Sequence, residues 1–122
     1  MQKGKVFRNY IFAGLLKKLD ENSYSFVYVE EYLNKENAKP ISLTFPLQKK
    51  EFTSKYLFPF FYNLLAEGKL KDIQCKELRI DISDDFSRLL LTTKENTIGS
   101  ITIEKDEIKN GKQDMFRLFS NR

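Results

Sequence analysis

The stretch between Pro40 and Gly68 constrains the fold of this chain most strongly, because its hydrophobic residues change their spacing partway along it. Apolar residues first alternate with polar ones at Ile41, Leu43 and Phe45, which is the pattern of a half-buried strand. Farther along, apolar residues recur at helical spacing until Gly68, a residue type that commonly ends helices. The pattern therefore predicts a short strand followed by the main helix of the domain.

Individual residue types locate the start and the buried face of this predicted helix. Thr53 or Ser54 is the expected N-cap, because a hydroxyl side chain can accept a hydrogen bond from the first free amides. Pro59 lacks an amide hydrogen, so we expect it in the first turn or at a kink. The residues of the whole segment that we assign to the core are Ile41, Leu43, Phe45, Leu57, Phe60, Phe61, Leu64 and Leu65.

Phe58 and Tyr62 lie outside that apolar face, and two interpretations of them stay open. They are four residues apart, so on a helix their rings would stack together on a neighbouring flank. If a second helix and the sheet cover this flank, both rings belong to the core. If the flank is uncovered, the two rings form an exposed aromatic ridge, which is the kind of anchor that dominates protein–protein interfaces. Only the second interpretation predicts that Phe58→Ala or Tyr62→Ala abolishes partner binding while the fold survives.

The rest of the chain predicts further strands and helices around this segment. A hairpin is expected to turn near Asn9, which tolerates a positive φ, and Gly14 indicates a bulge or a close backbone approach. The expected strands are 5–8, 11–18, 24–29, 41–45 and 100–103, with a helical turn at 30–34 and helices at 70–78 and from Ser83. This order indicates an α+β fold, with a small antiparallel β-sheet or partly closed barrel packed against two to three helices.

Apolar spacing also predicts which sides of the two later helices are buried. In the first of them, Leu70 and Ile73 are expected to face inward, together with Cys75 or Leu78. The expected inward residues of the last helix are Phe86, Leu89 and Leu90. Both helices are therefore expected to cover the sheet.

The pattern weakens after residue 104. We therefore divide the chain into a domain over 1–104 and a C-terminal tail over 105–122. The tail mixes charges with a late apolar cluster at Met115, Phe116, Leu118 and Phe119, which is typical of a docking helix.

The composition argues against catalysis and against a metal or cofactor site. The chain has no histidine and a single cysteine, which removes the commonest general base, a Cys–His pair and a cysteine-based metal site. Its glycines are isolated, so the sequence has no phosphate-binding glycine loop. The carboxylates Asp81, Asp84 and Asp85 lie at a predicted helix start, where they favour the positive end of the helix dipole. We expect no enzyme activity and no cofactor, with Cys75 in the core.

The charge pattern is that of an ordinary surface. The net charge is +4, but the lysines are interleaved with acidic residues and do not form the clustered footprint of a nucleic-acid-binding protein. The N-terminus lacks the apolar core of a signal peptide, and no apolar run has the length of a membrane span. We therefore expect a cytoplasmic protein with no direct contact to a membrane.

Several segments of the sequence, most clearly the stretch from Pro40 to Gly68, resemble the N-terminal subdomain of HipA-type toxin kinases. The family pattern P-[LI]-S-L-[ST]-x-P-L is similar to residues 40–47, and F-F-x-N-L-L-P-[ED]-G is similar to residues 60–68. Further similarities lie at residues 13–15, 24–28, 86–90 and 96–100, so the resemblance spans residues 5–104. Ala66 stands where the family has proline and Ser100 where it has alanine, so we expect a differently shaped loop after the main helix.

The resemblance implies a function as well as a fold. A HipA-like kinase continues into a catalytic core that this sequence lacks, and a free-standing N-terminal subdomain resembles HipS of the tripartite HipB–HipS–HipT toxin–antitoxin systems. By that resemblance, the protein is an antitoxin that binds and inhibits a HipT-like serine/threonine kinase toxin, while a HipB-like helix-turn-helix repressor supplies the DNA contact. The alternative is a structural or activating subunit of the kinase–repressor complex, with neutralisation done by the HipB-like partner. The residues expected to bind the kinase are Phe58, Phe61, Tyr62, Asn63, Ala66, Glu67 and Gly68.

Overall fold

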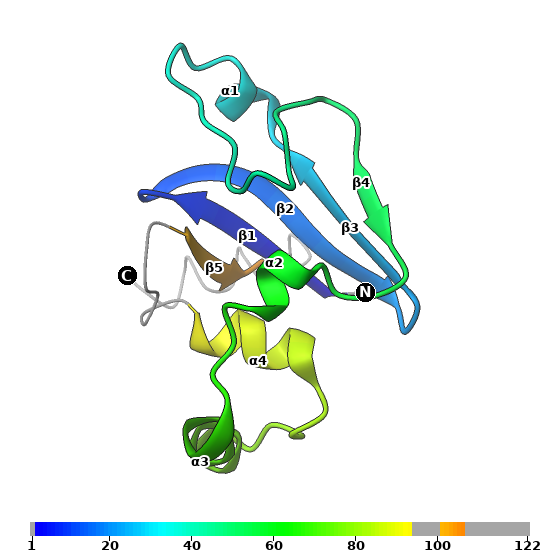
Figure 1. The fold of residues 1–122 in the computed structure, drawn as a ribbon, viewed down its shortest axis with the longest axis vertical. Coiled ribbons are helices and arrows are strands. Elements are labelled where there is room, and N and C mark those ends of the chain that lie inside the picture. The colour runs from blue at the N-terminus through cyan, green and yellow to red at the C-terminus, as the bar shows by residue number, and fades with distance from the viewer. Residues whose placement is uncertain (1, 94–100, 107–122) are drawn as a thin grey trace, which may run out of the picture.

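The computed structural model describes residues 2–93 and 101–106 of the chain. Its elements follow in the order β1 (Gln2–Arg8), β2 (Ile11–Asp20), β3 (Ser23–Tyr28), α1 (Glu30–Leu33), β4 (Phe52–Ser54), α2 (Pro59–Tyr62), α3 (Gly68–Leu78), α4 (Asp85–Thr92) and β5 (Ile101–Lys105) (Figure 1). The strands of the described part form one antiparallel sheet in the order β4-β3-β2-β1-β5. The expected α+β fold is therefore confirmed, as an open sheet and not as a closed barrel.

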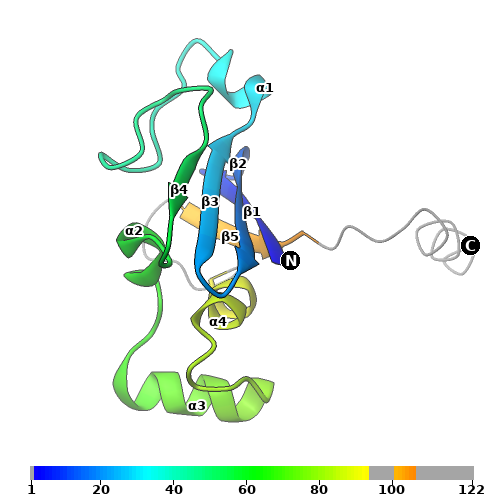
Figure 2. The ribbon, with the colours of Figure 1, turned by 90° about the vertical axis from the view of Figure 1, so that its right-hand side faces the viewer.

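The helices differ in how closely they approach the sheet. Helix α4 contacts β5 and α2, and α3 lies beyond α4, farther from the strands (Figures 1 and 2). The predicted inward residues of α4, Phe86, Leu89 and Leu90, are all buried in the core. None of the helices within the described ranges has the length and apolar character needed to cross a bilayer.

The first hairpin forms as its sequence predicts. Asn9 and Tyr10 both adopt positive φ, at 49° and 67°, which produces the tight turn between β1 and β2. The register then shifts because Val6 pairs with Gly14 and Phe7 pairs with Phe12, so one extra residue is inserted in β2. An added Cβ at Gly14 would lie 2.5 Å from the Val27 carbonyl oxygen on β3. Both expectations for Gly14, a bulge and a close approach, are confirmed.

Phe26 of β3 lies at the centre of an aromatic core. Its side chain is fully buried. The ring centroids nearest to it, at 5.0 to 6.2 Å, belong to Tyr28, Phe45, Phe52 and Phe61. These rings come from β3, β4, α2 and the loop before β4, so one residue joins four segments. Aromatic pairs of this kind contribute roughly 0.5–1.5 kcal/mol each beyond the area they bury.

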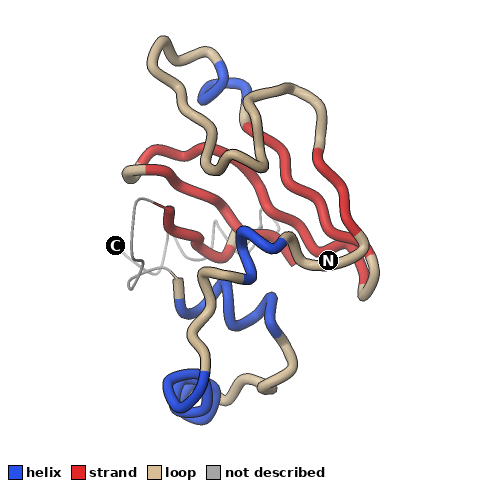
Figure 3. Tube along the Cα trace, in the orientation of Figure 1, coloured by secondary structure: helices blue, strands red, loops and turns tan. Residues whose placement is uncertain are grey.

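The strand predicted over 41–45 is wrong, because this segment is part of a long loop between α1 and β4 (Figure 3). Ile41 and Phe45 are buried as expected, but Leu43 is 98% exposed. Instead of strand hydrogen bonds, the Tyr28 hydroxyl holds this loop. It accepts a hydrogen bond from the Ile41 amide at 3.0 Å and donates one to the Phe45 carbonyl at 2.5 Å. The strand next to β3 is instead the short β4, which the alternation did not predict.

The long main helix is also wrong, because α2 spans only Pro59–Tyr62. Phe58 is extended, with ψ at 136°, since the ring of a following proline disfavours the helical conformation. Pro59 does lie in the first turn as expected, but Thr53 and Ser54 belong to β4 and cap no helix. Gly68 begins α3, with φ at 63°, and does not end the preceding helix.

The core residues assigned to this segment fare better than its predicted helix. Phe61 and Leu65 are buried in the cluster. The remaining three, Leu57, Phe60 and Leu64, are partly buried and pack against it. The expected inward face of α3 is wrong: Leu70 and Ile73 are 55% and 52% exposed, because α3 stands away from the sheet.

Side chains at the start of α4 were predicted nearly correctly. The N-cap is Asp84 and not Ser83, and its carboxylate accepts hydrogen bonds from the Ser87 amide and hydroxyl. Ser83 instead donates its amide and hydroxyl to Asp81, which lowers the pKa of the Asp81 carboxyl. Cys75 is buried, as expected. The tail expected to dock lies, from residue 107 onward, outside the described residues, as does Ser100.

Candidate protein-docking site

The residues expected to bind a partner lie between Phe58, which precedes α2, and Gly68, which begins α3, and the structure separates them into two groups. Phe61 has no exposed surface and Phe58 is 8% exposed, so both rings belong to the core. Ala66 is partly buried. The exposed members of the set are Tyr62, Asn63, Glu67 and Gly68.

Phe58 and Tyr62 differ in burial: Phe58 belongs to the core, as the first interpretation expects, whereas Tyr62 is exposed. The Phe58 ring packs edge-on against Phe45 and Phe61, with centroids 5.1 and 6.2 Å apart. Tyr62 is 43% exposed. The two rings do not share a helical flank, because Phe58 precedes α2 while Tyr62 is its last residue. The predicted ridge of two stacked rings is therefore absent, and of this pair only Tyr62 is exposed.

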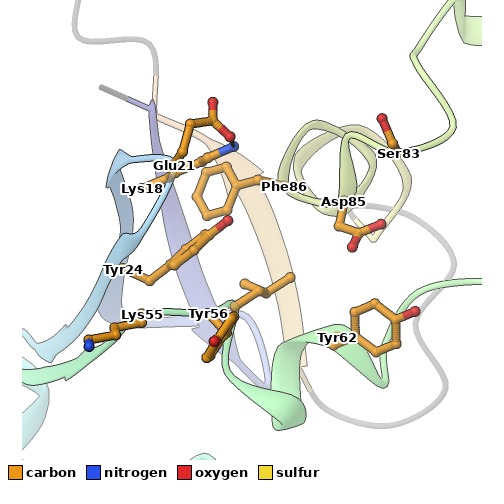
Figure 4. Close-up of a pocket in the computed structure, with 10 residues that line it drawn as sticks. Lys18, Glu21, Tyr24, Lys55, Tyr56, Tyr62, Ser83, Asp85 and Phe86 are labelled. Carbon is orange, nitrogen blue, oxygen red and sulfur yellow. Dashed lines mark ion pairs between the residues drawn. The ribbon is translucent and has the colours of Figure 1, made fainter.

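Tyr62 borders a hollow of about 330 Å³ between α2, the β2–β3 turn and the start of α4 (Figure 4). Its aromatic lining consists of Tyr24, Tyr56, Tyr62 and Phe86. The Tyr24 and Phe86 rings are 6.1 Å apart, and Tyr56 is 76% exposed. The rings come from β3, the loop before α2, α2 itself and α4, which the fold brings together.

Charged groups of both signs surround these rings. The Lys18 ammonium lies 5.9 Å from the centre of the Tyr24 ring and 3.8 Å from the Glu21 carboxylate. Lys55 lies on the opposite side of the hollow, and Asp85 lies on the α4 side (Figure 4). Exposed tyrosines within a polar, mixed-charge rim have the composition of a protein-binding surface.

The loop after α2 is fixed to α4 by one buried arginine. The Arg88 guanidinium donates a 2.6 Å hydrogen bond to the Ala66 carbonyl and pairs with Asp85 at 3.1 Å. Its side chain is only 3% exposed. Glu67 and Gly68 follow this anchor and are exposed, and an added Cβ at Gly68 would meet nothing within 4 Å. The exposed residues at the start of α3 therefore follow directly after this anchor.

Metal-ligating side chains are not clustered at this site within the described ranges. No group of three or more His, Cys, Asp or Glu side chains is arranged to hold a metal ion in residues 2–93 and 101–106. Cys75 is buried. The arrangement combines an exposed tyrosine, an exposed acidic residue at the start of α3 and a hollow beside Tyr62.

Sequence reasoning missed Tyr56, Tyr24 and Arg88 as parts of this site. Tyr56 was obscured because the predicted helix absorbed the whole aromatic run. The alternating pattern of residues 24–29 predicts only that Tyr24 lies in a strand. The sequence gives one indication for Arg88: it is a charged residue beside the apolar positions of a short amphipathic helix. Charged residues are buried almost only when they are paired, so a buried Arg88 needs a partner.

Comparison with known proteins gives one consistent result. The family model described as HipA N-terminal domain matches residues 4–104. An uncharacterized protein of Haemophilus influenzae strain Rd is 38% identical over 107 residues, which covers 88% of this chain and 95% of the relative. A solved structure described as the N-terminal domain of HipA toxin superposes with a TM-score of 0.65 at 37% identity, covering 89% of this chain and 96% of that one. The chain therefore belongs to the HipA N-terminal domain family.

Proposed function

We propose that this protein is a non-enzymatic antitoxin, which binds a HipT-like serine/threonine kinase toxin by protein–protein contact and inhibits it. Membership of the HipA N-terminal domain family supports a toxin–antitoxin context. The observation that carries the proposal is the exposure of Tyr62 and Tyr56 beside a hollow, on a chain whose other aromatic residues in this segment pack inward. A HipB-like repressor is the second partner, and it supplies the contact to DNA.

The docking face consists of Tyr62, Asn63, Glu67 and Gly68, with Tyr56 beside them. Tyrosine is favoured at such positions because its ring buries a large area while its hydroxyl keeps a hydrogen-bond partner. Phe58, Phe61 and Ala66 act behind this face, as the packed base that fixes α2 and the loop. Their substitution is expected to weaken binding through loss of that base.

Kinase activity measured with and without this chain tests the inhibition. We expect autophosphorylation of the toxin to fall as the protein is added in stoichiometric amounts, and co-expression to rescue growth. Tyr62→Ala should weaken toxin binding by about 30-fold or more, which is typical of an interface hot spot. The matched control is Tyr10→Ala, because Tyr10 is 92% exposed at the β1–β2 turn, away from the docking face. Equal binding by both variants, each with an unchanged melting temperature, would refute this face.

The second candidate is a structural or activating subunit of the kinase–repressor complex. The exposed apolar residues Leu70 and Ile73 on the outlying helix α3 favour it, since they form a second surface that can join an assembly. The same kinase assay separates the two functions. An increase in toxin activity on addition of this chain would support the activating subunit and contradict the antitoxin.

A further inference from the structure

A second hollow, of about 410 Å³, lies against α2 and β4. The loop over 42–45, β4 and the start of α2 border this open hollow, and its lining residues are Ser42, Thr44, Phe45, Phe52, Thr53, Phe58, Pro59, Phe60 and Asn63. This volume falls in the range of roughly 300–1,000 Å³ that is usual for ligand pockets. The hollow is therefore large enough for one or two bulky side chains.

The walls of this pocket carry no charge, although charged residues make up 31% of the chain. Phe45 forms the base, with its ring centroid 5.0 Å from that of Phe52, 5.1 Å from that of Phe58 and 6.1 Å from that of Phe60. Hydroxyl and amide side chains complete the lining, at Ser42, Thr44, Thr53 and Asn63. An aromatic base with neutral polar groups favours an uncharged guest, because no lining residue can pair with a charge.

The pocket adjoins an end strand of the sheet. Strand β4 pairs with β3 on one side and is the last strand in the sheet order. In residues 2–93 and 101–106, no other strand or turn forms backbone hydrogen bonds with its outer edge. Phe52 and Thr53 of this strand also line the pocket. An open edge beside a side-chain pocket is the arrangement by which extended peptides add to a sheet: main-chain bonds give affinity and the pocket gives selectivity.

We propose that β4 and this pocket bind an extended segment of the kinase toxin, with a bulky uncharged side chain of that segment held against Phe45. The identity of the partner rests on the proposed antitoxin function, whereas the groove and the chemistry of its guest rest on the structure of this chain. Asn63 lies at the junction of the two surfaces, because it lines the pocket and follows Tyr62 on α2. One partner chain can therefore cover both.

The test uses this 122-residue chain alone, labelled with nitrogen-15, and two capped peptides as probes. The first is acetyl-Thr-Val-Trp-Val-Thr-amide, and the second carries Asp in place of Trp. Titration with the first peptide is expected to shift the amide signals of Thr44, Thr53 and Asn63, whereas the acidic peptide leaves them unchanged. Asn63→Lys should weaken the first peptide about tenfold by placing a charge at the pocket. Asn37→Lys, the same substitution at an exposed loop position outside the pocket, should retain wild-type affinity.

Several results would overturn the proposal. These are the absence of pocket shifts with the Trp peptide, equal shifts with the acidic peptide, or equal weakening by both lysine variants. Nuclear Overhauser contacts between the pocket rings and side chains of residues 107–122 in the free protein would assign the pocket to the chain's own tail. Concentration-dependent shifts without peptide would assign it to a second copy. None of these readouts contains the kinase, so a failure of the antitoxin proposal in the kinase assay is a separate result.

Discussion

Removing one oxygen atom from Tyr28 should destabilise the loop that replaces the expected strand. In Tyr28→Phe the ring keeps its contacts, a 5.0 Å edge-on pair with Phe26 and a 5.9 Å stacked pair with Tyr32. What disappears is the hydroxyl that bridges the Ile41 amide and the Phe45 carbonyl, both in buried hydrogen bonds. The variant therefore isolates the polar clamp from the packing.

The expected loss follows from these two bonds. A typical intramolecular hydrogen bond contributes roughly 0.5–1.5 kcal/mol, and a buried group left without a partner costs roughly 1–3 kcal/mol. Two buried backbone groups lose their partner at once, so we expect Tyr28→Phe to lower the free energy of unfolding by about 2–4 kcal/mol. Tyr32→Phe is the matched control: its hydroxyl makes one, partly buried bond, to the Lys39 carbonyl, and its loss should cost about 1 kcal/mol.

Urea denaturation followed by circular dichroism measures both variants. The reasoning is refuted if Tyr28→Phe is no more destabilising than Tyr32→Phe, because the clamp would then carry no more weight than a peripheral bond. A pH series gives an independent check. Burial raises the pKa of Tyr28 above its usual value of 10.0, so the folded state holds this proton more tightly than the unfolded chain. The resulting stability is fully present below pH 10 and is lost as the pH rises through the folded-state pKa, a loss that Tyr28→Phe should not show.

Three further changes test other features of the fold. Gly14→Ala should lower the free energy of unfolding by about 3 kcal/mol in urea denaturation, because the added Cβ would meet a backbone oxygen. Gly68→Ala should cost about 1 kcal/mol, because Gly68 has open space around it but a positive φ. Equal costs would contradict the close approach at Gly14. Asp84→Ala should cost about 1 kcal/mol as the loss of an N-cap, and a Ser83→Ala variant that proves equally costly would restore Ser83 as the cap. Arg88→Ala should lower the free energy of unfolding by about 2–3 kcal/mol, because the charged hydrogen bonds of Arg88 are lost. It should also speed amide hydrogen exchange at Glu67 and Gly68. Unchanged exchange at these two residues would show that the loop is not anchored through Ala66.

The N-terminal half of the sheet could be predicted from sequence because its signals are local. Alternation over β3, a turn residue at Asn9 and a glycine at the bulge each act on their own segment and its immediate partner. Helix α4 was equally accessible, since its apolar face and capping carboxylate lie within ten residues of each other. The elements that could be predicted from sequence are therefore those whose interacting residues are near each other in the chain.

The middle segment could not be predicted for the same reason. Ile41 and Phe45 are buried in alternation, but the hydroxyl that holds them belongs to Tyr28, on another element. Pro59 favours extended backbone at Phe58, the residue before it, and this preference prevents the helix from starting earlier. The continuous apolar pattern nevertheless predicts a longer helix. Once α2 is short, Phe58 turns inward and Tyr62 outward, so the candidate site depended on a helix boundary that periodicity could not supply.

The position of β1 between β2 and β5 affects how the chain can fold during synthesis. Arg8 pairs with Ile101, so one edge of β1 stays open until almost the whole domain has been made. At roughly 5–20 residues per second, this interval lasts about 5 to 20 seconds. The hairpin can form early, but Val6 obtains its pairing partner Ile103 only at the end. Nascent chains are therefore exposed to wrong strand pairing for most of their synthesis, and binding competence is expected only once β5 has joined the sheet.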